Sequence, residues 1–133
     1  MRTTQLAVDT SRAQVVDITD DVEDFVRGEG DGLLSILALH ATAGLALMET
    51  GSGSEADLVA ALERLLPRGD RYAHRHGSTG HGADHLVPAL LSPSLTIPVE
   101  GGQLALGTWQ RVVLVDLNPD NPRRQVRLDL LTG

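Results

Sequence analysis

The chain has 133 residues, 41% of them hydrophobic, no cysteine, and a formal net charge of −7 from 11 arginines and 18 acidic residues. This length suits one domain, over residues 1–133, and excludes a (β/α)₈ barrel, while the missing cysteines exclude disulfides, thiolate metal sites and cysteine nucleophiles. The negative charge opposes binding to nucleic acid or anionic lipid, and because no segment has the pattern of a signal peptide or membrane span, we expect a cytoplasmic protein.

The first half of the chain predicts four strands and one helix. Residues 4–8 and 12–18 are rich in apolar and β-branched side chains, with a turn signal between them. Thr19 is a predicted N-cap, because two aspartates follow it and apolar residues then recur on one helical face. Residues 33–39 are almost all apolar, which predicts a strand covered on both faces, and residues 44–48 predict a second buried strand.

The second half predicts two helices, a long polar loop and four strands. The clearest helix has Ser54 as its N-cap and a stripe of four leucines, and it ends at Pro67. Its leucines are Leu58, Leu62, Leu65 and Leu66.

Residues 67–82 carry almost no apolar side chain, and a long structureless stretch inside a compact domain is often functional. A shorter helix is predicted at about 83–91, despite Pro88. The remaining strands are predicted at 94–99, 103–106, 111–117 and 123–131, with a hairpin turn at 100–103. Strands and helices mix without regular alternation, which favours an α+β domain.

Five histidines are the first candidates for site residues: His40, His74, His76, His81 and His85. Neutral imidazole is a common ligand of zinc, and catalytic zinc sites combine two or three histidines with one open position. His81 and His85 share a face if both are helical, whereas His74 and His76 lie on one side only in an extended chain. No spacing matches a specific motif, so solvated loop histidines and a metal or catalytic cluster stay open as alternatives.

Glu49, Trp109 and the arginine pair 123–124 are further candidates. Glu49 ends an apolar strand, where its carboxylate either acts as an acid, base or metal ligand or turns to water. Trp109 lies between two predicted strands and either packs in the core or belongs to a site with its polar neighbours. The two arginines either hold a phosphate group or form a solvated strand end.

Several segments resemble the YjbQ-like family. Residues 40–49 (HATAGLALME) are similar to the family pattern H-T-[ST]-A-x-L-x-x-N-E, and residues 101–110 (GGQLALGTWQ) are similar to G-x-L-x-L-G-T-W-Q. The match continues at Tyr72-Ala73-His74, Asp84-His85-Leu86, residues 94–99 (SLTIPV) and Pro122-Arg123-Arg124. It runs in order from about residue 3 to the C-terminus, and Gly-Thr-Trp-Gln in this setting is specific.

The resemblance implies a small α+β domain with a two-sheet β-sandwich and about three helices, assembled as a homotrimer. Some family members are described as secondary thiamine-phosphate synthases, which join hydroxymethylpyrimidine diphosphate to thiazole phosphate and release pyrophosphate. For this chain, the resemblance implies His40 and Glu49 as catalytic residues, and a divalent metal, zinc or magnesium, on His40, His74 and His85. The contacts to a small phosphorylated metabolite are expected from Thr108, Trp109, Gln110, Arg123 and Arg124.

The chain departs from the family pattern at Met48, where Asn is usual, and at Ala41, where Thr is usual. Met48 removes a polar group next to Glu49. His76 and His81 are additional to the pattern. The first hypothesis is an enzyme acting on a phosphorylated metabolite. The alternatives are a non-catalytic homotrimer that binds a metal or small molecule, and a structural domain whose histidines are incidental.

Overall fold

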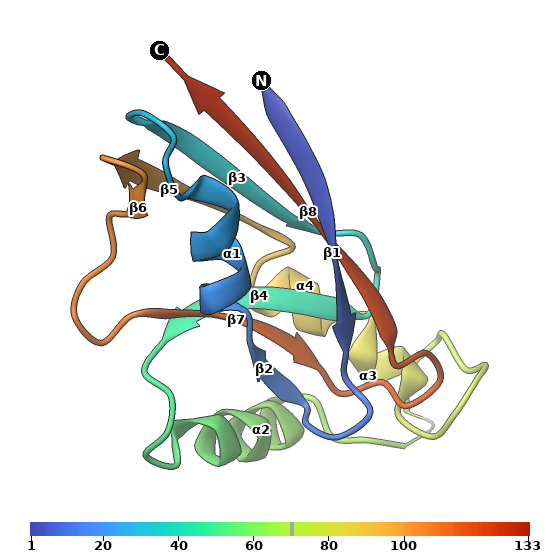
Figure 1. Ribbon diagram of the computed structural model, residues 1–133. Helices are drawn as coiled ribbons and strands as arrows, with labels where there is room; N and C mark the ends of the chain where they lie inside the picture. Colours follow the sequence, from blue (N-terminus) through green and yellow to red (C-terminus); the bar gives the residue numbers. More distant parts are fainter. Residues whose placement is uncertain (70) are drawn as a thin grey trace.

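The structure, a computed structural model, describes residues 1–69 and 71–133. Two antiparallel sheets, ordered β1-β8-β3-β5-β6 and β2-β7-β4, enclose the main hydrophobic core between them (Figure 1). The strands are β1 (Arg2–Asp9), β2 (Val15–Asp17), β3 (Gly32–Ala38), β4 (Ala43–Met48), β5 (Ser94–Glu100), β6 (Gln103–Leu104), β7 (Arg111–Asp116) and β8 (Arg123–Thr132). The helices are α1 (Thr19–Val26), α2 (Ser54–Leu65), α3 (His81–Asp84) and α4 (Val87–Leu90). This arrangement confirms the predicted α+β class with two sheets.

The strand that is covered on both faces is β7. Val112 and Leu114 pack in the core between the sheets, and the alternate valines pack in a second core beneath α2. The prediction of a doubly covered strand at 33–39 is wrong, because β3 alternates between buried and exposed positions. Leu34 is fully buried, whereas its neighbour Leu33 is 51% exposed on the outer face of the five-stranded sheet. Apolar content alone did not distinguish the two strands.

Helix α1 bridges the two sheets by contacting β6 and β7 (Figure 1). Val22 and Val26 are fully buried, as its amphipathic pattern predicts. Thr19 is the first helical residue rather than the cap, and Asp17 Oδ1 accepts its amide N–H at 2.9 Å and its hydroxyl at 2.6 Å. Burial raises the pKa of Asp17, but its hydrogen bonds from Thr19 and Arg111 outweigh burial and hold the pKa below its ordinary value.

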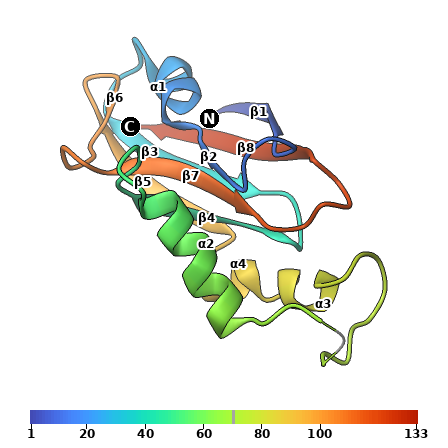
Figure 2. The same ribbon diagram turned by 90° about the horizontal axis from the view of Figure 1, so that it is seen from below.

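Helix α2 lies across the outer face of the three-stranded sheet (Figure 2). Leu62 is buried against β7, but Leu65 is 70% exposed, so the apolar stripe is narrower than the sequence predicts. The cap is Gly53, with φ of 97°, and Ser54 is the first helical residue. The helix ends before Pro67, as predicted.

The helix predicted at 83–91 is two single turns, α3 and α4. Pro88 has no N–H to donate to the carbonyl of Asp84, four residues earlier, so a continuous helix is interrupted there. The first turn begins earlier than predicted, at His81, after Gly80 with φ of 90°. His81 therefore lies one helical turn before His85, inside the segment predicted to be loop.

The remaining strands agree with the prediction apart from their ends. Residues 12–18 form only the short β2, and residues 103–106 form only the two-residue β6. The predicted hairpin between β5 and β6 is present, with Gly101 and Gly102 at φ of 56° and 75°. Such positive φ angles favour glycine at both central positions of the turn. No helix in the described part of the chain is long and apolar enough to cross a membrane.

Candidate metal centre

Three histidine side chains converge at the polar loop and the helix that follows it. The ring nitrogens of His74, His81 and His85 lie within 4.8 Å of one another, and we call these residues the histidine trio. Nε2 of His81 and Nε2 of His85 are 3.0 Å apart. The ring of His76 lies at the rim, with its centroid 4.1 Å from that of His74. The trio thus contains two of the three metal ligands implied by the family resemblance, His74 and His85, and adds His81.

Local backbone geometry brings the trio together. In α3, the four-residue spacing puts His81 and His85 on one side of a single turn. His74 comes from the preceding loop, which passes very close to α3 at Gly82. A Cβ atom at residue 82 would lie 2.4 Å from the carbonyl oxygen of His74, a distance that forces the backbone to shift. Gly82 is therefore required for this approach of the loop to the helix.

Polar side chains from the turn after β7 contact the inner face of His81. Its Nδ1 lies 3.1 Å from Asp120 Oδ2 and 3.1 Å from Asn118 Nδ2. Asp120 Oδ2 also accepts the amide N–H of Ser78 at 3.1 Å, and this bond is the largest cause of its lowered pKa. When Nδ1 of His81 carries the ring proton, it donates to the Asp120 carboxylate, and the Asn118 amide donates to Asp84 instead. In that tautomer the Nε2 lone pair is available to a ligand.

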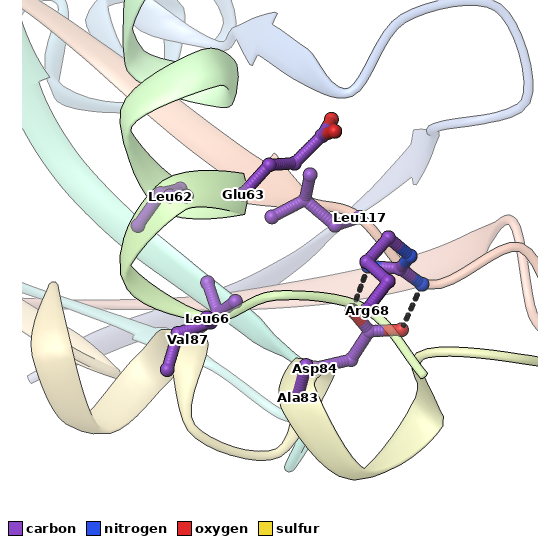
Figure 3. A pocket seen from close by; sticks show the side chains of 8 residues that line it. All are labelled: Leu62, Glu63, Leu66, Arg68, Ala83, Asp84, Val87 and Leu117. Carbon is purple, nitrogen blue, oxygen red and sulfur yellow. Dashed lines mark hydrogen bonds and ion pairs between the residues drawn. The ribbon is translucent and has the colours of Figure 1, made fainter. Parts of the chain in front are cut away.

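A buried ion pair supports α3 from below. Asp84, whose side chain is fully buried, binds the guanidinium of Arg68 through two hydrogen bonds of 2.6 and 3.0 Å (Figure 3). Asp84 Oδ2 also accepts a 2.9 Å bond from Asn118, the same side chain that contacts His81. The hydrogen bond to Asp84 is the largest cause that raises the pKa of Arg68. These contacts tie the end of α2, the turn after β7 and α3 into one network beneath the trio.

His40 lies outside the trio. Its Nε2 accepts the backbone N–H of Gln125 at 2.8 Å, so the lone pair that would bind a metal is already engaged. Burial, followed by the charge of Arg124, lowers its pKa. Within one chain, His81 and not His40 therefore lies with His74 and His85.

Arg124 does not present its charge at the surface. Its guanidinium is 3% exposed and binds Asp116 through bonds of 2.6 and 2.9 Å, with a third bond to Thr42 of 3.0 Å. This pairing engages the guanidinium that was expected to contact a phosphate group, and the burial of Arg124 also excludes the alternative of a solvated side chain. Arg123 is exposed and pairs in register with Asp9.

Glu49 and the segment Thr108–Gln110 lie at the other end of β7 from the trio. Met48 is in register with Arg111, so Glu49 follows β4 at the edge where residues 108–110 precede β7. Both are exposed, with Trp109 at 73%, and Gln110 folds back to accept the N–H of Gly107 at 2.8 Å. A six-residue strand spans roughly 20 Å. Within a single chain, the carboxylate of Glu49 is therefore far from the histidine trio.

Sequence reasoning missed the residues that orient the trio. Asn118, Asp120 and Arg68 were not considered as site residues, and Asp84 was named only as part of the family resemblance. The available signal was the spacing of His81, Asp84 and His85, which is that of a helical turn with one buried and one open face. The predicted loop boundary at residue 82 concealed it.

The family model described as UPF0047 protein YjbQ-like matches residues 4–133. A UPF0047 protein of Mycobacterium tuberculosis is 60% identical over 133 residues, 100% of both chains. A UPF0047 protein of Archaeoglobus fulgidus is 37% identical over 86% of this chain and 90% of that one.

Among solved structures, a hypothetical protein from Aeropyrum pernix K1 has a TM-score of 0.89 at 34% identity, covering 100% of both chains. A YbjQ-like protein of unknown function from Sulfolobus solfataricus P2 has a TM-score of 0.90 at 27% identity, covering 99% of this chain and 97% of that chain.

Proposed function

The chain belongs to the YjbQ-like UPF0047 family, and we propose that it uses His74, His81 and His85 to bind one divalent metal ion. The observation that carries the proposal is the convergence of their three ring nitrogens within 4.8 Å. In a tetrahedral zinc site, bonds of about 2.0–2.1 Å hold ligand nitrogens roughly 3.3 Å apart. The 3.0 Å separation of the two Nε2 atoms on α3 is close to that value, so small side-chain adjustments suffice.

The donor set favours zinc over magnesium. Imidazole nitrogen suits zinc and other first-row transition metals, whereas magnesium prefers oxygen ligands and keeps several waters. Asp120, behind His81, is the kind of carboxylate that commonly orients a histidine ligand. Three protein ligands leave a fourth position for water or substrate, which is typical of a catalytic rather than a structural zinc site.

Elemental analysis of the purified protein tests this metal site. The wild type is expected to bind one zinc ion per chain, and His81→Ala and His85→Ala are expected to lose it. His40→Ala is the matched control, because it removes an imidazole that lies outside the trio. If His40→Ala abolishes zinc binding while His81→Ala retains it, the ligand set implied by the family resemblance replaces the one proposed here.

For the activity, we propose a metal-dependent enzyme that acts on a small phosphorylated metabolite. The metal would supply Lewis acidity toward phosphate oxygens. The specific reaction that the family resemblance supports is thiamine-phosphate synthesis, in which pyrophosphate leaves hydroxymethylpyrimidine diphosphate as it is joined to thiazole phosphate. Release of pyrophosphate from the two substrates by the zinc-loaded protein tests it, with His81→Ala as the inactive control. Zinc binding without turnover would favour the alternative, a non-catalytic binding protein.

A variant of Glu49 distinguishes an enzyme from a non-catalytic binding protein. In an enzyme that uses it as a base, Glu49→Gln keeps ligand affinity and loses rate, whereas a binding protein has no rate to lose. Its distance from the trio within one chain predicts that Glu49→Gln leaves zinc content unchanged.

We also propose a homotrimer in the cytoplasm, as the family resemblance and the sequence suggest. Leu33 and Leu131 support self-association, since they are paired across β3 and β8 and are 51% and 58% exposed. Light scattering on the purified protein measures the mass; a monomer at micromolar concentration contradicts the trimer.

A further inference from the structure

A small polar cavity lies next to the histidine trio, within the loop that precedes α3. Its volume is about 70 Å³, and its walls include His74, Arg75, His76, Ser78 and His81. The cavity thus shares two residues with the trio and adds an arginine, a hydroxyl and a further imidazole.

The size of this cavity restricts what can enter it. A water molecule occupies about 30 Å³ of liquid, so the space holds a group of only a few heavy atoms. Pockets that enclose a whole organic ligand measure about 300–1,000 Å³. A single small group can therefore enter, while the rest of a larger ligand stays outside.

The chemistry of the walls favours a tetrahedral oxyanion. Arg75 belongs to the cavity wall, and its Nε donates one bond of 2.9 Å to the carbonyl of Tyr72. The two terminal nitrogens of a guanidinium can bind an oxyanion through paired hydrogen bonds. Ser78 Oγ is buried, lies beside the Asp120 carboxylate, and makes no hydrogen bond of good geometry among the described residues. A bound oxyanion would give this buried hydroxyl a well-aligned acceptor.

The backbone of the loop also suits close approach of an anion. Gly77 and Gly80 have φ of 78° and 90°, and glycine-rich turns of this kind let main-chain N–H groups approach a ligand closely. The guanidinium of Arg68 lies against Gly80, although its charge is paired with Asp84. Among the described residues, the Asp120 carboxylate lies beside the cavity, and its Oδ2 is bound by Ser78 N–H and by His81.

We infer that this cavity binds a single phosphate group, free or as part of a phosphate ester, beside the metal held by the trio. The inference rests on the proposed metal site and deepens it by naming the group that meets the metal. Arg75 is a binding residue for the anion, and Ser78 donates its hydroxyl to a phosphate oxygen. Because the cavity admits only the phosphate, the remainder of an ester lies toward solvent.

Calorimetric titration of the zinc-loaded protein with inorganic phosphate tests the inference. Removing a guanidinium that binds the anion directly is expected to weaken phosphate binding tenfold or more, so Arg75→Ala should show that loss. Arg71→Ala is the matched control, because Arg71 is an exposed arginine of the same loop outside the cavity wall, and it should change the affinity less than twofold. Ser78→Ala should weaken binding as well, with zinc content unchanged in all three variants.

The outcomes separate this inference from the metal site. If zinc binds but phosphate does not, or if Arg75→Ala and Arg71→Ala weaken phosphate equally, the phosphate site is wrong and the metal site stands. If no zinc binds to the wild type, the proposed metal site fails. Acetate is the comparison anion: affinity equal to that of phosphate would overturn the assignment to a tetrahedral oxyanion.

Discussion

Replacing Asp120 by alanine removes the carboxylate that contacts Nδ1 of His81, and we expect this change to weaken zinc binding about tenfold. Loss of a residue that orients a metal ligand typically costs 10- to 100-fold in metal affinity. The lower end applies here, because the Asp120 side chain is 37% exposed. A tenfold loss corresponds to about 1.4 kcal/mol.

Competition for zinc with a chromophoric chelator at pH 7 measures this affinity. Asp120→Asn should fall between the wild type and Asp120→Ala, since the amide keeps an oxygen acceptor and loses the charge. Asp31→Ala is the matched control, because Asp31 is also an exposed carboxylate that accepts one backbone N–H, from Gly101 at 2.8 Å. Wild-type affinity in Asp120→Ala, or an equal loss in Asp31→Ala, would refute the orienting role.

The other predictions concern stability and loop geometry. Asp116→Ala should lower the free energy of unfolding in urea by about 3–5 kcal/mol, because it leaves a buried arginine uncompensated; Asp129→Ala, which breaks a more exposed pair, should cost about 1 kcal/mol or less. Asp17→Asn should destabilise the protein at pH 7 and make little difference at pH 2. Because the pKa of Asp17 is lowered in the folded state, its carboxylate stabilises the fold above pH 3.8, and this stabilisation is lost as the pH falls through the folded-state pKa. A difference in stability between variant and wild type that is the same at pH 2 as at pH 7 contradicts this. Gly82→Ala should lose zinc while the far-ultraviolet circular dichroism spectrum is retained, because its Cβ would meet a loop carbonyl at 2.4 Å. Gly30→Ala, with open space around it, should keep zinc; equal zinc content in both variants would show that the close approach is not needed.

Strands were predictable because their pattern is local. In β8, alternate residues from Arg124 to Leu130 are buried, a period of two that the sequence carries directly. The glycine pair of the β5–β6 turn was predictable for the same reason, since positive φ angles favour glycine. Exact helix starts were less predictable: Ile18 and Gly53, not Thr19 and Ser54, are the cap residues.

The candidate site was predictable only in part. His74 and His85 could be selected as chemically capable residues, and a polar loop of this length indicated a functional segment. The position of His81, rather than His40, beside His74 and His85 was not predictable, because it depends on three contacts between distant residues. The N–H of Gln125 engages His40 from 85 positions away, and Asn118 and Asp120 contact His81 from 37 and 39 positions away.

The sequence by itself determined the class of fold and the chemical groups available for a site, since composition and local periodicity do not depend on the distant parts of the chain. With neither lysine nor cysteine, it limited the reactive groups to histidine, carboxylates and arginine. Only the tertiary structure decided which strand is covered twice and which histidines meet. Burial of β7 depends on where α2 packs, and the trio depends on how closely the loop passes α3 at Gly82, so both follow from contacts that no local pattern records.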